Sequence, residues 1–311
     1  MTFYAKPRQR AGLGVLAPPT RCIGYDTSVP LSRTHAPLRI VSLQPSATVI
    51  LEAVGALDRL VACTRYCVDV CPQAAAGRTV VADSWSANSE EILSTRPDLV
   101  IAAVPYQEKS VAAILKAGVR FLGLAPRTLA DIYVDIAAIA GIVGAAQRGE
   151  TVVYSMQNEI ERVRQQTRDL QHPKVFSEEW GKPLIASQPW VAELITAAGG
   201  EFVACPGLQT SFDWVRSAGP EVLIASWCGA GDRVPLDKIV RDRAWQDLPA
   251  VRQQRVFCIA DELLNTPAPT LIAGLYALAA AIHPEKFPSV RGLRRISDVS
   301  HETRPAGASL V

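Results

Sequence analysis

The chain has 311 residues, which is enough for two ordinary domains that each bury a core of their own. Hydrophobic residues make up 49% of the sequence and charged residues 20%, values close to those of globular proteins, which excludes a disordered or fibrous class. The 32 basic and 30 acidic side chains are mixed along the chain and leave a formal net charge of +2, so we expect no nucleic-acid partner.

Residues 1–38 are expected to form a flexible N-terminal extension. Basic residues up to Arg10 precede a short apolar stretch that Pro18 and Pro19 interrupt. A secretory signal has a continuous apolar segment followed by a cleavage site of small residues, and neither is evident here. The sequence as given therefore predicts a cytoplasmic protein, and a periplasmic one if the start of the chain was assigned wrongly.

The first half of the chain alternates between strands and helices. Helices are expected near Ser46, which can cap one that Gly55 ends, and at residues 89–95 and 107–117. Short apolar runs predict five strands, at residues 39–43, 60–63, 79–82, 98–102 and 120–124. This alternation implies a parallel sheet with right-handed crossovers.

A helical stretch without a strand candidate follows, from residue 128 to about residue 170. Gly141 and Gly144 indicate a break within it. Its second part, residues 150–170, alternates charges at helical spacing, as Glu159 and Arg162 illustrate, which is typical of an exposed helix.

Strands resume in the second half at residues 174–177, 221–226 and 255–259, before an apolar helix at 269–282. The residues from Arg291 on are basic and polar and are expected to form a loose tail. The predicted fold is α/β, with two Rossmann-like parallel-sheet lobes joined by one long spanning helix. The segments are the lobes 39–125 and 172–288, the helical connector 126–171 and the tail 289–311.

Two stretches of the sequence repeat one pattern. Residues 88–102 are NSEEILSTRPDLVIA and residues 211–225 are SFDWVRSAGPEVLIA. Each predicts a short helix, a proline and a buried strand that ends in Ile-Ala. Glu90 lies seven residues before Pro97, and Asp213 lies seven residues before Pro220. The repeat indicates two similar lobes, each with an exposed acid at the start of a short helix.

Aromatic residues follow five of the predicted strands. Ligands bind beyond the carboxyl ends of the strands in open parallel sheets. Rings there offer flat apolar contact, and carboxylates there can accept hydrogen bonds from a ligand. Any one ring is more simply explained as a cover for its own core, but the repetition in both halves favours a pocket. The candidate ligand-binding residues are Tyr66, Trp85, Tyr106, Trp180, Trp227, Asp261 and Glu262.

The cysteines number seven, an odd and scattered set, so we expect reduced thiols rather than a disulfide framework. Cys63, Cys67 and Cys71 are spaced by four and would share one face of a helix, where they could hold a soft metal. Val68 and Pro72 disfavour a helix there, and no histidine or fourth cysteine is near. We expect no metal site.

Signatures of catalysis are absent from the sequence. It contains neither the phosphate-binding loop Gly-x-x-x-x-Gly-Lys nor the nucleophile elbow Gly-x-Ser-x-Gly. Its four histidines lie mostly beside prolines or near the ends of the chain, and no nucleophile–base pair suggests itself. We therefore predict a binding protein rather than an enzyme, with no required cofactor.

Four segments carry a resemblance to a known family: RIVSLQPSAT, TRYCVDVCPQA, NSEEILSTRPDLVIA and WVAELITAAGG. In this order they resemble the cobalamin-binding branch of the helical-backbone (class III) periplasmic binding proteins, over about residues 39–288. Those proteins are the ligand-capture subunits of ABC importers for cobalamin, haem and ferric siderophores. The resemblance implies two lobes joined by one rigid helix, with a corrinoid-type ligand between them, in a protein expected to be a monomer.

The resemblance also implies roles for particular residues. Glu90 and Asp213 match the acids that dock on arginines of an ABC permease, although Asp213 is shorter than the usual glutamate. Tyr66 and Trp85 match ring-contacting aromatics, and Asp261 matches an acid in the far lobe.

Three alternatives stay open. The ligand could be haem or a ferric siderophore, and Arg65, Lys109 and Lys182 would suit the anionic siderophores. The protein could be a cytoplasmic corrinoid or metal-chelate carrier without a transporter. It could also be an enzyme that uses the cleft between the lobes to grip a metal cluster or tetrapyrrole.

Overall fold

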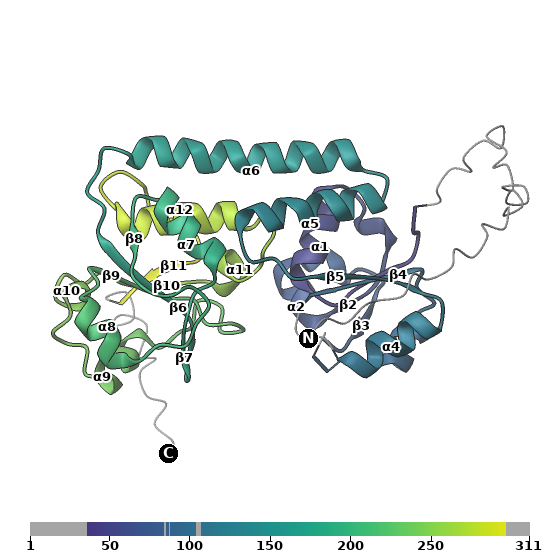
Figure 1. Ribbon diagram of the computed structural model, residues 1–311, viewed down its shortest axis with the longest axis horizontal. Coiled ribbons are helices and arrows are strands. Elements are labelled where there is room, and N and C mark those ends of the chain that lie inside the picture. The colour runs from purple at the N-terminus through teal and green to yellow at the C-terminus, as the bar shows by residue number, and fades with distance from the viewer. Residues whose placement is uncertain (1–35, 84, 87, 104–106, 297–311) are drawn as a thin grey trace, which may run out of the picture. The chain divides into compact units, whose positions relative to one another are not determined.

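The computed structural model describes residues 36–83, 85–86, 88–103 and 107–296. The chain from Ala36 onward forms one unit, in which two separate sheets alternate with helices (Figure 1). No helix in this part of the chain is both long and apolar enough to cross a bilayer.

The N-terminal lobe has a five-stranded sheet in the order β3-β2-β1-β4-β5, and every neighbouring pair is parallel. Each strand lies within a residue or two of its predicted position, and the parallel arrangement predicted for this sheet is confirmed. The order reverses between β1 and β4, which is where ligands bind in folds of this type. The strands are β1 Ile40–Ser42, β2 Leu60–Thr64, β3 Thr79–Val81, β4 Leu99–Ala103 and β5 Arg120–Leu124.

One helix of this lobe, α2 (Arg65–Val70), contradicts the prediction that this stretch is not helical. The hydroxyl of Thr64 accepts a hydrogen bond from the backbone N–H of Cys67 and so caps the first turn. Pro72 lies just beyond the last turn, where it removes no helical hydrogen bond. The other helices are α1 Pro45–Ala53, η1 Leu57–Arg59, η2 Pro72–Ala75, α3 Ser89–Ser94 and α4 Glu108–Lys116.

Two helices, α5 (Leu129–Ile142) and α6 (Ala146–Thr167), connect the lobes. A capping box formed by Thr128 and Asp131 starts α5. The predicted break lies at Gly144, which has a φ of +68° that few other residues adopt. The helix α6 begins four residues earlier than the predicted range 150–170.

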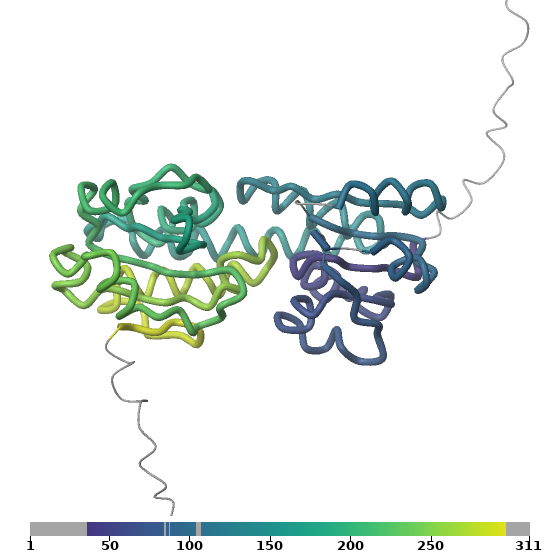
Figure 2. Tube along the Cα trace, turned by 90° about the horizontal axis from the view of Figure 1, so that it is seen from below, coloured from purple at the N-terminus to yellow at the C-terminus, as the bar shows by residue number. Residues whose placement is uncertain are grey.

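The hydrophobic core continues from one lobe into the other. It includes Ile50 of α1, Ile136 of α5, Ile160 of α6, Leu194 of α7 (Pro189–Ala197) and Leu278 of α12 (Leu271–Ile282). The helix α6 packs against α5 and α1 of the N-terminal half and against α7 and α12 of the C-terminal half. Each lobe is formed by its own part of the chain. In Figure 2 the N-terminal lobe is coloured purple to blue and the C-terminal lobe green to yellow. The predicted architecture of two α/β lobes and one long helix is confirmed.

The three strands predicted for the C-terminal lobe, β6, β9 and β10, pair in parallel as expected, and short strands that the sequence did not mark make this sheet mixed. Its order is β11-β10-β9-β6-β7, with β8 also paired to β6. The edge strands β7 and β11 are antiparallel to their neighbours. Each of these two strands has three residues, too few for an apolar pattern to mark it. The strands are β6 Lys174–Gly181, β7 Leu184–Ala186, β8 Glu201–Phe202, β9 Val222–Ala225, β10 Val256–Ile259 and β11 Leu293–Arg295.

The prediction of a loose tail from Arg291 is wrong for β11. Leu293 packs against the core, and Arg294 donates hydrogen bonds to the carbonyls of Asp232 and Val234. The basic residues of this segment led us to expect an exposed tail. Instead, hydrogen bonds from Arg294 to backbone carbonyls hold the segment against the lobe. The remaining helices of the lobe are α8 Phe212–Ala218, α9 Leu236–Asp242, α10 Pro249–Arg252 and α11 Asp261–Leu264.

Candidate ligand-binding site

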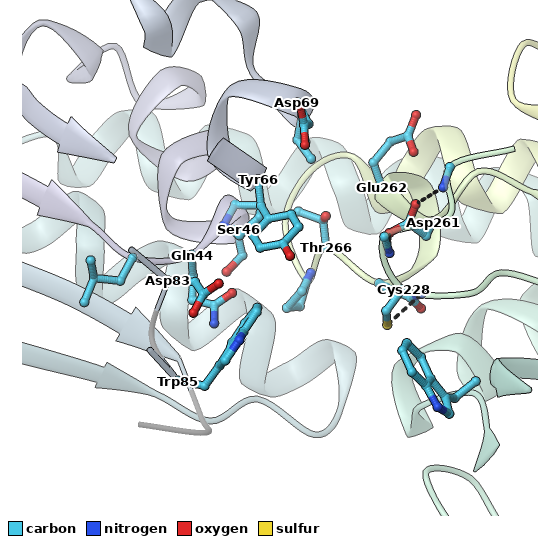
Figure 3. A pocket seen from close by; sticks show the side chains of 18 of the residues that line it. Gln44, Ser46, Tyr66, Asp69, Asp83, Trp85, Cys228, Asp261, Glu262 and Thr266 are labelled. Carbon is cyan, nitrogen blue, oxygen red and sulfur yellow. Dashed lines mark hydrogen bonds between the residues drawn. The ribbon is translucent and has the colours of Figure 1, made fainter. Parts of the chain in front are cut away.

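A cavity of about 790 Å³ is lined by side chains of both lobes (Figure 3). Its volume lies within the usual range for small-molecule sites. In the N-terminal lobe the lining residues follow β1, β2 and β3, and in the C-terminal lobe they lie at the end of β6 or follow β9 and β10. The cavity therefore lies at the carboxyl ends of parallel strands, the position that sheet topology predicts for a ligand.

Two aromatic rings form part of the N-terminal wall. The centroids of Tyr66 and Trp85 are 5.7 Å apart, with the planes tilted by 40°. The Arg65 guanidinium lies 4.6 Å from the Tyr66 ring centroid and donates a hydrogen bond to its hydroxyl at 2.7 Å. Trp85 is 49% exposed, so much of its ring is available to a flat ligand.

Carboxylates dominate the charged lining of the cavity. Asp69 and Asp83 come from the N-terminal lobe and Asp261 and Glu262 from the other (Figure 3). Of the described residues that line the cavity, Arg233 is the one Lys or Arg. Two of the acids have local partners, because Asp83 accepts hydrogen bonds from Ser86 and Asp261 from backbone N–H groups. The lining favours a ligand that donates hydrogen bonds or carries positive charge over an anionic one.

Asp261 has a structural part in the C-terminal wall. Its carboxylate accepts hydrogen bonds from the backbone N–H groups of Gly229 and Gly231, both at 2.7 Å. These glycines have φ of +77° and +59°, so the loop after β9 takes a backbone path that other residues rarely adopt. Asp261 therefore shapes the loop that borders the cavity.

The two tryptophans predicted for the C-terminal wall differ in position. Trp180 lines the cavity, is 44% exposed, and donates its indole N–H to the carbonyl of Lys182 at 3.0 Å. Trp227 is half-buried and is not among the lining residues, and its N–H donates to the Glu178 carboxylate at 3.0 Å. Tyr106 lies outside the described residues.

A polar group that the sequence did not reveal borders the cavity beside Trp227. The Asn265 amide donates to the carbonyl of Ser226 at 2.7 Å and lies 3.3 Å from the Cys228 sulfur. Desolvation, with smaller contributions from Glu179 and Asp261, raises the pKa of the Cys228 thiol to about 12. The thiol therefore stays protonated at neutral pH and offers the cavity a weak donor rather than a thiolate.

Glu179 lies next to this group. Its carboxyl accepts a hydrogen bond from the Gln188 side chain at 2.6 Å. Burial raises the pKa of Glu179 to about 7, so the group titrates near neutral pH.

Several of the lining residues that sequence reasoning missed are neutral polar residues close to strand ends. Their one signal is position, because they follow the strands directly or by a few residues. They include Gln44, Ser46, Cys228, Asn265 and Thr266. Of the predicted site residues, the structure brings together Tyr66, Trp85, Trp180, Asp261 and Glu262. The basic residues considered for an anionic ligand, Arg65, Lys109 and Lys182, are not among the lining residues.

The two repeated acids lie away from the cavity lining, at helix starts. Glu90 is exposed in the first turn of α3, where Asn88 caps the helix. Asp213 is exposed in the first turn of α8, capped by Ser211, and accepts a hydrogen bond from Arg216 at 2.9 Å. Both positions suit a negative charge because the start of a helix carries partial positive charge.

The three spaced cysteines are packed in the N-terminal core. Cys63, Cys67 and Cys71 are each buried, and the Cys67 sulfur lies 3.2 Å from the Thr64 hydroxyl. In the part of the chain that the structure describes, no three His, Cys, Asp or Glu side chains are placed to hold a metal ion.

Comparison with known proteins gives a match over most of the chain. A family model described as periplasmic binding protein matches residues 40–263. The vitamin B12-binding protein of Vibrio cholerae is 29% identical over 239 residues, covering 74% of this chain and 84% of the relative. An uncharacterized ABC transporter substrate-binding lipoprotein of Bacillus subtilis, YvrC, is 25% identical over 264 residues, covering 81% of this chain and 82% of the relative.

Solved structures resemble the chain over nearly their whole length. The periplasmic vitamin B12-binding protein BtuF of Vibrio cholerae has a TM-score of 0.64 at 26% identity, covering 79% of this chain and 97% of that structure. The periplasmic heme-binding protein RhuT of Roseiflexus sp. RS-1 has a TM-score of 0.70 at 25% identity, covering 79% and 98%. All four of these relatives are named as binding proteins.

Proposed function

Because the chain belongs to the periplasmic binding protein family, we propose that it is the substrate-binding component of an ABC importer, with a cobalamin-type corrinoid as ligand. The observation that carries the ligand class is the cavity lining, in which aromatic rings stand beside four carboxylates and Arg233. Its function is non-catalytic capture, so the ligand is cargo and no cofactor is needed.

The chemistry of a corrinoid suits this lining. Its broad ring offers an apolar face to Tyr66, Trp85 and Trp180, and its amide side chains can donate to Asp69 or Glu262. Haem carries two carboxylates and many ferric siderophores are anionic, so both would meet like charge in the cavity. The likeness to vitamin B12-binding proteins supports the same ligand class.

One contact favours haem as the second candidate. Tyrosine oxygen is a known ligand of haem iron. The Tyr66 ring lines the cavity, and its hydroxyl oxygen accepts a hydrogen bond from Arg65 at 2.7 Å, which holds this oxygen in place. The likeness to a heme-binding protein at 25% identity supports this alternative.

Titration of the purified protein distinguishes these ligands. Cyanocobalamin, haem and a ferric catecholate are added separately, and quenching of tryptophan fluorescence is followed. We expect cyanocobalamin to bind most tightly, because the carboxylates of the lining disfavour the anionic ligands, and to quench the fluorescence of Trp85 and Trp180 in the cavity. Tighter binding of haem would replace the corrinoid assignment, and no quenching by any of the three would refute the ligand proposal.

Importer function needs a membrane partner, and Glu90 and Asp213 are proposed to contact basic residues of an ABC permease. Their exposure and their matched positions in α3 and α8 support this role. We further propose that the protein acts in the periplasm, because its structural relatives BtuF and RhuT are described as periplasmic. Cell fractionation tests the location, and recovery in the cytoplasm alone would favour a carrier without a transporter.

A further inference from the structure

A buried ion pair lies behind the wall of the cavity, on the strand that carries Trp180. The Arg243 guanidinium donates to the Glu178 carboxylate at 2.6 Å, and the two side chains are 6% and 3% exposed. The other Glu178 oxygen accepts the indole N–H of Trp227 at 3.0 Å. Both oxygens of the carboxylate are therefore occupied by fixed donors.

The same groups hold Gly181, the residue that follows Trp180. Arg243 donates a second hydrogen bond to the Gly181 carbonyl at 3.2 Å. The Trp227 ring lies against the Gly181 backbone so closely that a Cβ atom added there would be 2.3 Å from the ring carbon Cζ2. Only glycine allows this contact without a shift of the ring or the strand.

The strand itself is irregular at this point. In a regular strand Trp180 would point the same way as the buried Glu178, two residues earlier. The pairing of β6 with β7 shifts register between these two residues, and such bulges redirect side chains. Trp180 is thereby exposed to the cavity while Glu178 stays buried.

Stability alone does not explain a buried pair of this kind. Burial raises the pKa of Glu178, and the interactions with Arg243 and Trp227 oppose this rise because they favour the charged carboxylate. Apolar residues of similar volume often serve a core as well as a buried ion pair. The contacts instead converge on one backbone position beside the cavity.

We propose that Glu178, Arg243 and Trp227 are positioning residues that fix the orientation of Trp180 in the cavity. Trp227 thus acts through Gly181 and not by contact with the ligand. The consequence for affinity rests on the proposed function, whereas the orientation of Trp180 is a property of the free protein.

Fluorine NMR of protein labelled with 5-fluorotryptophan tests the orientation without any ligand. The Trp180 signal is assigned by its loss in Trp180→Phe. We expect this signal to shift or broaden in Glu178→Gln and in Gly181→Ala, which changes no charge. The signal of Trp190, whose N–H donates to the Leu264 carbonyl, serves as internal reference and should stay unchanged.

A matched control is Tyr276→Phe, which removes a hydroxyl that donates to Glu159 at 2.7 Å in a different polar network. It should leave the Trp180 signal in place. An unchanged Trp180 signal in both Glu178→Gln and Gly181→Ala would overturn the proposal.

A double-mutant cycle with cyanocobalamin tests the effect on affinity. We expect Gly181→Ala to weaken binding about tenfold when Trp180 is present and less than about twofold in the Trp180→Ala background, because contacting residues are coupled. Equal losses in both backgrounds would show that the network does not act on binding through Trp180. If the unmodified protein does not bind cyanocobalamin, the ligand proposal fails, and the NMR result alone decides the orientation.

Discussion

The two walls of the cavity hold their aromatic rings by different means. In the N-terminal lobe, Tyr66 is supported by Trp85 and by the exposed Arg65. In the C-terminal lobe, the strand end that carries Trp180 is held by the buried pair Glu178–Arg243. The ends of the two sheets therefore place aromatic rings in the cavity in a similar way, but the supports of these rings differ in how rigid we expect them to be. Exposed contacts allow a ring to adapt to a ligand, whereas buried charged hydrogen bonds resist displacement.

The largest effect is expected where each lobe is proposed to meet the permease. The double variant Glu90→Ala/Asp213→Ala should abolish ligand uptake by cells while leaving ligand affinity unchanged. Of the single variants, Glu90→Ala should reduce uptake more, because Arg216 already compensates the charge of Asp213. Ligand uptake is measured with cells and labelled cyanocobalamin, and ligand affinity is measured by fluorescence titration of the purified protein.

The control for this pair is Glu161→Ala on α6. Glu161 is also an exposed acid and pairs with Arg164 three residues on, at 2.7 Å. Its loss should not affect uptake. Survival of uptake in the double variant would remove the importer proposal and leave a free carrier.

The next largest effect should come from Asp261, the acid that fixes the C-terminal wall. Asp261→Ala removes two charged hydrogen bonds to the loop after β9, at 2.7 Å each, and should destabilise the protein by about 2–4 kcal/mol. Urea denaturation measures the change. Glu262→Ala, at the neighbouring position, should change stability by less than about 0.5 kcal/mol. Similar losses for both variants would contradict the structural part assigned to Asp261.

Glu179 gives the C-terminal lobe a dependence on pH. Burial raises the pKa of this carboxyl from 4.5 to about 7. The unfolded chain therefore releases this proton first, and the group lowers the free energy of unfolding as pH rises from about 4.5 to about 7. Between pH 5 and pH 8 the loss should be about 1–3 kcal/mol.

Glu179→Gln should remove this part of the pH dependence and make the protein more stable than the original at pH 8. Denaturation at the two pH values measures both. Burial also raises the pKa of Asp135 in α5, to about 6, so this group adds its own pH dependence. The contribution of Glu179 is therefore obtained by comparing the pH dependence of Glu179→Gln with that of the original protein. An unchanged difference between pH 5 and pH 8 would contradict the burial of Glu179.

The smallest effect should be seen at the adaptable wall. Trp85→Ala should weaken ligand binding about tenfold, in keeping with the area that an aromatic ring contributes. Arg65→Ala should weaken corrinoid binding less than about threefold, because exposed contacts contribute little. A larger effect of Arg65→Ala on haem than on cyanocobalamin would instead favour the haem alternative.

The sequence predicted the elements that are defined by a pattern of consecutive residues. Runs of four or five apolar residues marked most of the central strands, and Gly144 marked the break before α6. The short strands β7, β8 and β11 had no such pattern, since pairing with a neighbour defines them. The helix α2 was missed because the Thr64 cap outweighs the weak helix propensity of its valines.

The sequence predicted the position of the site at the strand ends and several of its aromatic residues, but not all of its lining residues. Aromatic residues after strands pointed to Tyr66, Trp85 and Trp180, which line the cavity. The same rule selected Trp227, whose ring instead lies on Gly181, a contact that depends on how two distant segments pack. Asn265 lies a few residues beyond a strand but belongs to no chemical pattern, so nothing in its identity marked it.

Because the core continues through α6, we expect the two lobes to unfold as one cooperative unit. Because Ile136, Ile160 and Leu278 belong to the same apolar cluster, neither lobe can unfold without exposing the surface on which the other rests. Calorimetry should show a single transition, and a chain cut near Gly144 should yield fragments that associate or aggregate. On this expectation the lobes resemble independent modules in their topology but not in their thermodynamics. A chimera that takes one lobe from a relative would also need the α6 residues that pack against that lobe.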